Sequence, residues 1–262
     1  MKRIRNLLHA YAACLTKNEK ILRIVSTVAG ELVVLCTLIV LLIRKDSAHL
    51  DMCITSFAMV LLPVAVELLL RCKMRLFIYI STFIYAFTPM CGECFRMYYT
   101  TIWWDKFSHI VGGMICAMYG FYIFRRLCGG KANRIAAALF ALFFSVTFAV
   151  GWECFEYAGD CLFGMDTQND VIIREINSYM IPTDTGVPGT IKEIKIVTLD
   201  GKEFPFEGYL DIGLHDSMQD MIVEIAGALV AMAIILIDKE KHLMILPFDT
   251  GGETAEKKEE IS

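Results

Sequence analysis

The chain alternates long apolar runs with short polar connections. About 20 consecutive apolar residues in a helix cross a lipid bilayer, and six runs reach or approach that length. They are residues 24–43, 52–70, 76–92, 107–124, 135–155 and 218–237. The pattern predicts an all-α membrane protein, a bundle of six transmembrane helices within residues 24–238.

Two segments flank this predicted bundle. In residues 1–23, Ile4, Leu7 and Tyr11 repeat at helical spacing among basic residues, which predicts an amphipathic helix. Such a helix either lies on the inner leaflet of the membrane or caps the bundle. Residues 239–262 form a cytoplasmic polar tail, and within it residues 249–262 are polar and charged without apolar periodicity, so we expect that part to be disordered.

One connection, residues 161–215, is too long to be a turn. Inside it, β-branched residues alternate on both sides of Asp200-Gly201, a pair that favours a type I′ turn because Gly adopts φ > 0 easily. We therefore expect a β-hairpin with strands at residues 191–198 and 203–210. Long loops are usually functional lids or disordered segments, and a defined hairpin favours a lid.

The composition excludes a soluble globular domain. Of the 262 residues 56% are hydrophobic, with 17 Phe and only 6 Pro. The net charge of −4 is small, and nothing in the sequence indicates a nucleic-acid partner. The first apolar run is longer than the apolar core of a signal peptide, about 7–15 residues, so we expect it to remain in the membrane.

The basic residues predict an orientation. Lys and Arg in short loops tend to stay in the cytoplasm, and most of the 25 Lys and Arg residues fall on the side of the N-terminus when six spans are counted. We therefore expect a multi-pass protein of the cell membrane with both termini cytoplasmic. The same count makes the hairpin insertion extracytoplasmic.

The ten cysteines give little indication of disulfides. Half of them lie inside the apolar runs, where a thiol acts as a small hydrophobic group. Cys91 and Cys94 have the spacing of a redox or metal motif, but they close a membrane span rather than open a helix. Packing is the preferred interpretation, and the redox state of the pair stays open.

Ionisable side chains gather at the ends of three predicted spans. Asp105 and His109 open the fourth span four residues apart, which places both on one helical face. Three acids close the fifth span and three open the sixth, at spacings of three or four. In the predicted orientation all of them lie at the outer side of the membrane. The eight candidate metal ligands are Asp105, His109, Glu153, Glu156, Asp160, Asp216, Asp220 and Glu224.

These seven acids need positive compensation. A charged carboxylate at the centre of a lone membrane helix costs about 2.5–3.5 kcal/mol, and Lys106 and Arg96 cannot balance the cluster. Either mutual repulsion keeps some carboxyls protonated, or a divalent metal ion binds, or both. Oxygen ligands favour Mg²⁺, Mn²⁺ or Ca²⁺, and His109 leaves Zn²⁺ or Fe open. Alternatively, Asp105 and Asp216 cap helix N-termini at the water interface.

Three further acids lie within or beside the apolar runs. Glu31 and Glu67 lie toward the inner end of the predicted bundle, and Glu93 at the outer end could join the cluster. A line of acids through the membrane is typical of a proton or cation path. An ion pair between Glu67 and Arg71, four residues apart, explains Glu67 without transport.

The motifs around the acidic cluster resemble those of the YjdF-like inner-membrane family and, more distantly, the VanZ-like proteins. The YjdF-like pattern Asp-x-x-x-His, Glu-x-x-Glu and Asp-Thr-x-x-Asp-Met is matched by DKFSH, ECFE and DSMQDM, with Ser217 in place of Thr. The VanZ-like pattern has Gln and Asn where Glu156 and Glu224 stand. The resemblance covers the last four spans. It implies a site in the outer leaflet and no particular reaction.

The sequence leads to one expected function and two alternatives. We expect the acidic/His pocket to bind a divalent cation and a lipid headgroup or an envelope lipid intermediate. If the site is catalytic, His109 and Glu153 are the general-base candidates, and the metal polarises a phosphoryl or ester oxygen. The alternatives are a cation- or proton-coupled transporter and a non-catalytic membrane scaffold. The sequence leaves the substrate and the oligomeric state open.

Overall fold

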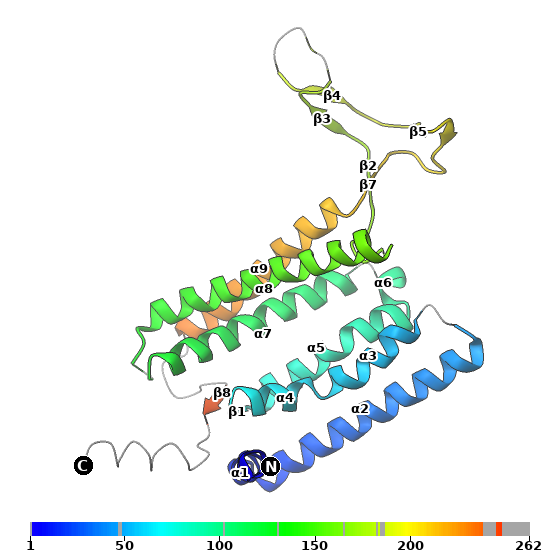
Figure 1. Cartoon of the computed structure of the whole chain (residues 1–262). Helices are drawn as coiled ribbons and strands as arrows, with labels where there is room; N and C mark the ends of the chain where they lie inside the picture. The colour runs from blue at the N-terminus through cyan, green and yellow to red at the C-terminus, as the bar shows by residue number, and fades with distance from the viewer. Residues whose placement is uncertain are drawn as a thin grey trace. The chain divides into compact units, whose positions relative to one another are not determined.

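The computed structural model is mostly helical (Figure 1). It describes residues 2–46, 49–101, 103–129, 131–164, 166–181, 183, 187–237 and 245–247. Within these ranges five helices are long and apolar enough to cross a membrane. They are α2 (Lys17–Arg44), α5 (Leu76–Cys94), α7 (Trp104–Leu127), α8 (Arg134–Phe163) and α9 (Leu214–Ile237).

A sixth span results if the bent pair α3 (Leu50–Val60) and α4 (Leu62–Leu69) is counted as one. The two helices meet at 47°, and Pro63 lies in the first turn of α4. Proline lacks a backbone N–H and its ring clashes with the preceding turn, so a straight helix is interrupted there. The expected helical membrane protein is confirmed with five or six spans, and its orientation stays a prediction.

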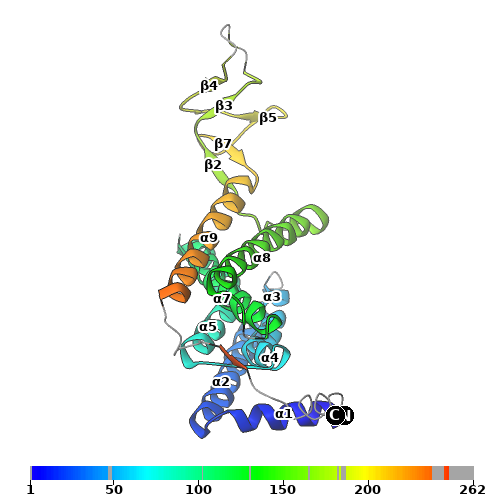
Figure 2. The ribbon, with the colours of Figure 1, turned by 90° about the vertical axis from the view of Figure 1, so that its left-hand side faces the viewer.

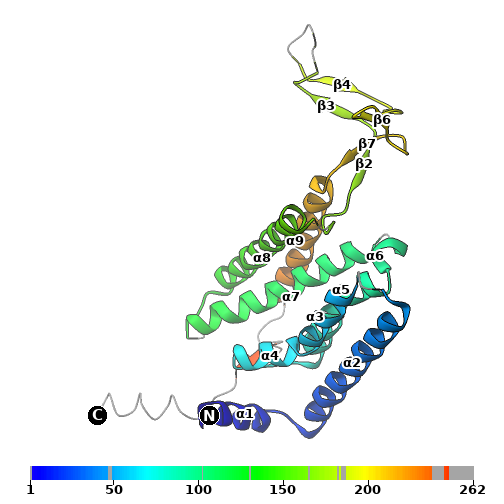
Figure 3. The same ribbon diagram turned by 45° about the vertical axis from the view of Figure 1, so that its right-hand side comes forward.

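The N-terminal segment forms α1 (Lys2–Cys14) and the first turns of α2. Thr16 caps α2, because its hydroxyl accepts a hydrogen bond from the Glu19 amide while its own amide donates to the Glu19 carboxylate. Tyr11 and Leu15 are buried against α4, and Figure 3 shows α1 at an angle to α2. This part of α1 therefore caps the bundle, whereas Ile4 remains exposed.

The chain divides into two compact units, of which the first comprises Met1–Thr147 and Val223–Ser262. Within it α5 packs against α3 and α7 (Figure 1). The core includes alanines from three helices, Ala117 of α7, Ala138 of α8 and Ala231 of α9, each at most 1% exposed. Small side chains let membrane helices approach closely, which strengthens van der Waals contact where lipid weakens the hydrophobic effect.

A short strand pair closes one end of the first unit. The strand β1 (Cys72–Met74) pairs antiparallel with β8 (Ile245–Pro247), in a register that sets Lys73 opposite Leu246. The chain therefore returns to the connection between α4 and α5 after the last span. The remainder of the expected polar tail, residues 239–244 and 248–262, lies outside the described residues.

The second unit, Phe148–Ile222, carries the insertion between α8 and α9. The insertion contains three antiparallel strand pairs, and Figure 2 shows β3 and β4 beyond β2 and β7. They are β2 (Val171–Ile173) with β7 (Tyr209–Asp211), β3 (Ile176–Ser178) with β4 (Gly189–Ile191), and β5 (Thr198–Leu199) with β6 (Lys202–Glu203). The remaining described helix, the four-residue α6 (Met97–Thr100), lies in the first unit.

The expected hairpin is correct at its turn and wrong in its length. Asp200 and Gly201 both have positive φ, 50° and 75°, between the two-residue strands β5 and β6. The predicted strand at 203–210 ends early because Pro205 has no amide to donate. Its last residue, Leu210, pairs instead with Ile172 near the base of the insertion.

Candidate metal centre

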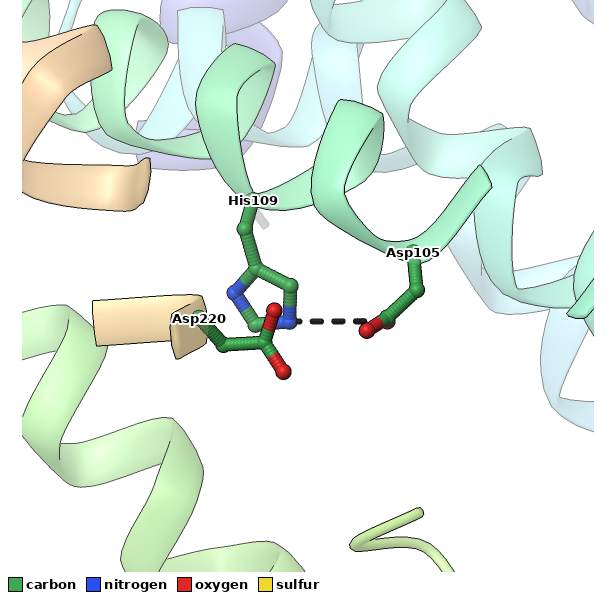
Figure 4. Close-up of side chains that lie close together, drawn as sticks. All are labelled: Asp105, His109 and Asp220. Atoms are coloured by element: carbon green, nitrogen blue, oxygen red, sulfur yellow. Dashed lines mark ion pairs between the residues drawn. The ribbon is translucent and has the colours of Figure 1, made fainter. Parts of the chain in front are cut away.

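The first part of the site lies on one face of α7. Asp105 is in the first turn and His109 follows one turn later. Figure 4 shows the imidazole directed along the helix toward the carboxylate, and His109 Nε2 is 3.7 Å from Asp105 Oδ1. The His109 side chain is 9% exposed. The predicted pairing of these residues on one helical face is therefore present.

The other imidazole nitrogen faces α9. His109 Nδ1 is 3.5 Å from Glu224 Oε2, and the Glu224 side chain is 8% exposed. Both distances from the ring nitrogens to carboxylate oxygens exceed the roughly 2.7–2.9 Å of a strong charged hydrogen bond. The ring thus lies between two carboxylates, and each is close enough to interact with one of its nitrogens.

Two glycines bring α7 and α9 together beside this pair. A Cβ on Gly113 would overlap the carbonyl oxygen of Glu224, and a Cβ on Gly227 would overlap the carbonyl oxygen of Ile110. In addition, the Ser145 hydroxyl of α8 donates to the Gly113 carbonyl at 3.0 Å. The close approach of the two helix backbones fixes the position of Glu224 along α9 relative to His109 on α7.

Asp220, one helical turn before Glu224, completes a group that could hold a metal ion. Asp105, His109 and Asp220 each offer one ligand atom, and these atoms lie within 4.8 Å of one another (Figure 4). Two ligands of a tetrahedral Zn²⁺ ion lie about 3.3–3.6 Å apart, whereas two ligands on opposite sides of a Ca²⁺ ion are up to about 5 Å apart. The spacing therefore suits a metal with small side-chain adjustments. Asp220 is 1% exposed.

The charges of this group favour a cation. Asp105 pairs with Lys106, whose Nζ is 3.1 Å from Asp105 Oδ2. Buried carboxylates are costly unless they are paired or bind a metal. Three acids, Asp105, Asp220 and Glu224, thus lie close to one imidazole.

Two of the other predicted ligands have local partners in the second unit. The Asp160 carboxylate accepts from the Thr167 amide at 2.7 Å and from the Gln168 amide at 3.0 Å. The Asp216 carboxylate accepts from the Asn169 amide at 2.9 Å. Asp160 thus bonds the start of the insertion to the last turn of α8, and Asp216 bonds it to the first turn of α9. The helical spacing did not predict this role.

The remaining two predicted ligands lie on α8. Glu156 is half-buried and accepts from Trp152 Nε1 at 2.6 Å. Glu153 is 7% exposed. Neither belongs to the metal-binding group that the described residues form.

Glu67, expected to pair with Arg71, pairs with Arg23 instead. Arg23 donates to both carboxylate oxygens, at 2.8 Å from Nε and 2.6 Å from Nη2. The Met74 amide donates to the same carboxylate at 2.7 Å, and the Tyr11 hydroxyl donates as well. Glu67 is fully buried. Local spacing in the sequence does not indicate this pair, since its members are 44 residues apart.

Glu93, expected near the cluster, lies beside His49 instead. His49 Nε2 is 4.0 Å from Glu93 Oε2, and its Nδ1 is 2.9 Å from both Asp46 oxygens. Cys91 and Cys94 are free thiols. The Cys94 thiol donates to the His49 carbonyl at 3.7 Å, in agreement with a packing role.

Comparison with known protein families identifies the family of this chain. The family model described as "Predicted membrane protein (DUF2238)" matches residues 27–241, from the first span to just beyond the last. The chain belongs to this family. No curated protein and no solved structure matches it. The DUF2238 match does not confirm the narrower YjdF-like and VanZ-like names, and its description states no reaction.

Proposed function

We propose that this protein binds a divalent cation through Asp105, His109 and Asp220 and uses it to bind a phosphate-bearing lipid headgroup or envelope lipid intermediate. The observation that carries the proposal is the buried Asp/His/Asp group with ligand atoms within 4.8 Å. Glu224 acts as a positioning residue, because a carboxylate on the second imidazole nitrogen orients a metal-ligating histidine.

The bound ion would supply a positive charge that polarises a phosphoryl or ester oxygen of the lipid. In this arrangement His109 would present Nε2 to the ion, and Glu224, 3.5 Å from Nδ1, would orient the ring. This assignment occupies His109, one of the two expected bases. Glu153, buried on α8, is then the candidate for taking a proton from an attacking water.

The site is proposed to face the outer leaflet. The distribution of Lys and Arg along the chain supports this orientation, with both termini in the cytoplasm. Reporters that are active on only one side of the membrane, fused at either end of the chain, test it. Activity of the cytoplasmic reporter at both ends is expected.

Metal content of the purified protein tests the main proposal. We expect one divalent ion per chain by inductively coupled plasma mass spectrometry, and its loss in Asp220→Asn. Glu224→Gln keeps the ligands and should weaken metal affinity by about 10–100-fold. Glu156→Gln is the matched control, since this acid bonds Trp152 and lies outside the group. No ion in any variant, or equal loss in the control, would refute the proposal.

Transport is the less supported function. The transport path drawn from the sequence needed Glu67 as a free acid, and Glu67 is engaged by Arg23, Tyr11 and Met74. A carboxylate held by a bidentate guanidinium is a poor proton or cation carrier. Proteoliposome cation flux that falls in Glu67→Gln and persists in His109→Ala would reverse this order.

A further inference from the structure

A groove of about 660 Å³ lies in the first unit, away from the proposed metal ligands. One wall is the second half of α2, and the opposite side is formed by the end of α5 and the residues that follow it. The volume is within the range of about 300–1,000 Å³ that is usual for small-molecule sites. None of the metal-binding residues lines it.

The wall of the groove on α2 is apolar. It includes Leu32, Val33 and Val40, which are 56%, 45% and 44% exposed. In a membrane this surface faces alkyl chains rather than water. A ligand in the groove would therefore place hydrocarbon along α2.

The end of the groove carries two arginines. Arg44 is in the last turn of α2 and Arg96 precedes α6, and both side chains line the groove. Among the described residues neither guanidinium has an ion-pair partner, and Arg96 lies 5.5 Å from the centre of the Tyr99 ring. Two guanidinium groups at a helix end are well suited to a phosphate.

The acidic group in the lining does not cancel these charges. Asp46 is the one carboxylate among the lining residues, and both its oxygens are 2.9 Å from His49 Nδ1. Arg44 and Arg96 thus keep the net charge of the groove positive. An amphiphile with an anionic phosphate complements both the charged end and the apolar wall.

We propose that this groove binds one anionic phospholipid, with its phosphate between Arg44 and Arg96 and an acyl chain along Leu32, Val33 and Val40. The site is independent of the proposed metal centre, so either can fail alone. A zwitterionic lipid fits less well, because Asp46 is already engaged by His49 and would not receive the ammonium group.

Native mass spectrometry of the full chain tests the proposal. Protein extracted from nanodiscs of phosphatidylcholine with a minor fraction of phosphatidylglycerol should retain one phosphatidylglycerol. Arg44→Gln and Arg96→Gln should each weaken its retention by about ten-fold or more, since each removes a charged hydrogen-bond donor. Arg125→Gln is the matched control, because Arg125 also stacks on an aromatic ring, Phe121, and does not line the groove.

A second variant tests the apolar wall without touching the arginines. Cys36→Trp should fill the groove and reduce lipid retention, because Cys36 lines it and is exposed. The unfolding transition in detergent micelles should be unchanged in Arg44→Gln and Arg96→Gln, which shows that these variants are folded whether or not the chain binds a metal.

Several outcomes would overturn the proposal. Equal retention of phosphatidylcholine would remove the role of the anionic headgroup. Displacement of the lipid by an equal concentration of inorganic phosphate would make the groove a phosphate site. An Arg125→Gln effect as large as that of Arg44→Gln would indicate general surface charge. A dimer mass lost in Arg44→Gln would identify a second copy of the chain as the occupant.

Discussion

Two clusters of ionisable side chains both keep carboxylates away from water, and they compensate the buried charge in opposite ways. Around Glu67, a bidentate guanidinium, a backbone amide and a phenol satisfy the carboxylate. Around His109, the ring nitrogens are 3.5 and 3.7 Å from two carboxylates, and a further buried acid, Asp220, is close by. We call the first the closed cluster, because hydrogen-bond donors surround its one carboxylate. We call the second the acid-rich cluster, because Asp105, Asp220 and Glu224 lie close to one imidazole.

The closed cluster has a structural role. It joins α1, α2, the end of α4 and β1, and Arg23 also lies 4.4 Å from the centre of the Tyr79 ring. Burial, followed by the Glu67 contact, raises the pKa of Tyr11, so the phenol keeps its proton and remains a donor. The comparison teaches that a buried acid by itself does not mark a function. What matters is whether the surrounding groups satisfy it.

The largest expected effect breaks the closed cluster. Arg23→Met leaves Glu67 buried beside an apolar side chain and should destabilise the protein by about 3–5 kcal/mol. The double variant Arg23→Met with Glu67→Leu should recover most of that loss, since no charge remains buried. Unfolding in detergent micelles measures both.

The control for this experiment is Lys73→Met. The Lys73–Glu19 pair, 3.0 Å apart, is partly exposed, and such pairs contribute about 0–1 kcal/mol. A loss in Arg23→Met no larger than that in Lys73→Met would mean that the Glu67 cluster is not desolvated.

The next effect concerns the acid-rich cluster and the metal. A chelator should lower the stability of the wild-type protein by about 2–3 kcal/mol if the ion was present near 100 times its Kd. Asp220→Asn should abolish this response. In chelator the variant should be more stable than the wild type, because one surplus buried acid has been removed.

Glu67→Gln is the contrasting variant, since it should lose the same stability with and without chelator. This difference in sign separates the two clusters directly. Asp220→Asn that destabilises equally in both conditions would show that Asp220 is a closed structural acid like Glu67, and that no cation belongs to the group.

Helical spacing in the sequence predicted part of the candidate site. A separation of four residues placed Asp105 with His109 and Asp220 with Glu224 on single helical faces, and both pairings hold because one turn of helix is a local property. The apolar runs likewise gave the spans, since their length is set by the bilayer.

The rest depended on contacts that local spacing does not contain. Asp160 and Asp216 have the same spacing as the other candidates, but amides of a loop after α8 occupy them. Glu67 has Arg71 four residues away and pairs with Arg23, because the turn after α4, where Arg71 has a positive φ of 47°, breaks the helical relation. The partner of a buried charge is decided by tertiary packing.

The smallest expected effect uses a third set of acids, outside the membrane spans. Partial burial, then the charges of Asp166, Asp160 and Asp211, raise the pKa of Asp170 in the second unit. Its folded pKa lies above the unfolded value of about 3.9, so the stabilisation is complete below that pH and is lost as pH rises through the folded pKa. The residue is exposed, and water keeps the effect small.

Titration of the Asp170 carboxyl by NMR measures this directly. Asp166→Asn should lower the pKa of Asp170, whereas Glu193→Gln, an exposed acid that is not among the charges acting on it, should leave it unchanged. Added salt should reduce the shift, since exposed charges are screened within about 8–10 Å at physiological ionic strength. Metal binding at the buried group should resist the same salt, because buried charges are screened much less. The opposite outcome is that salt abolishes the pKa shift of Asp170 and metal binding at the buried group to the same extent. In that case the acids around His109 would be as hydrated as those around Asp170, and their charge would not require a cation.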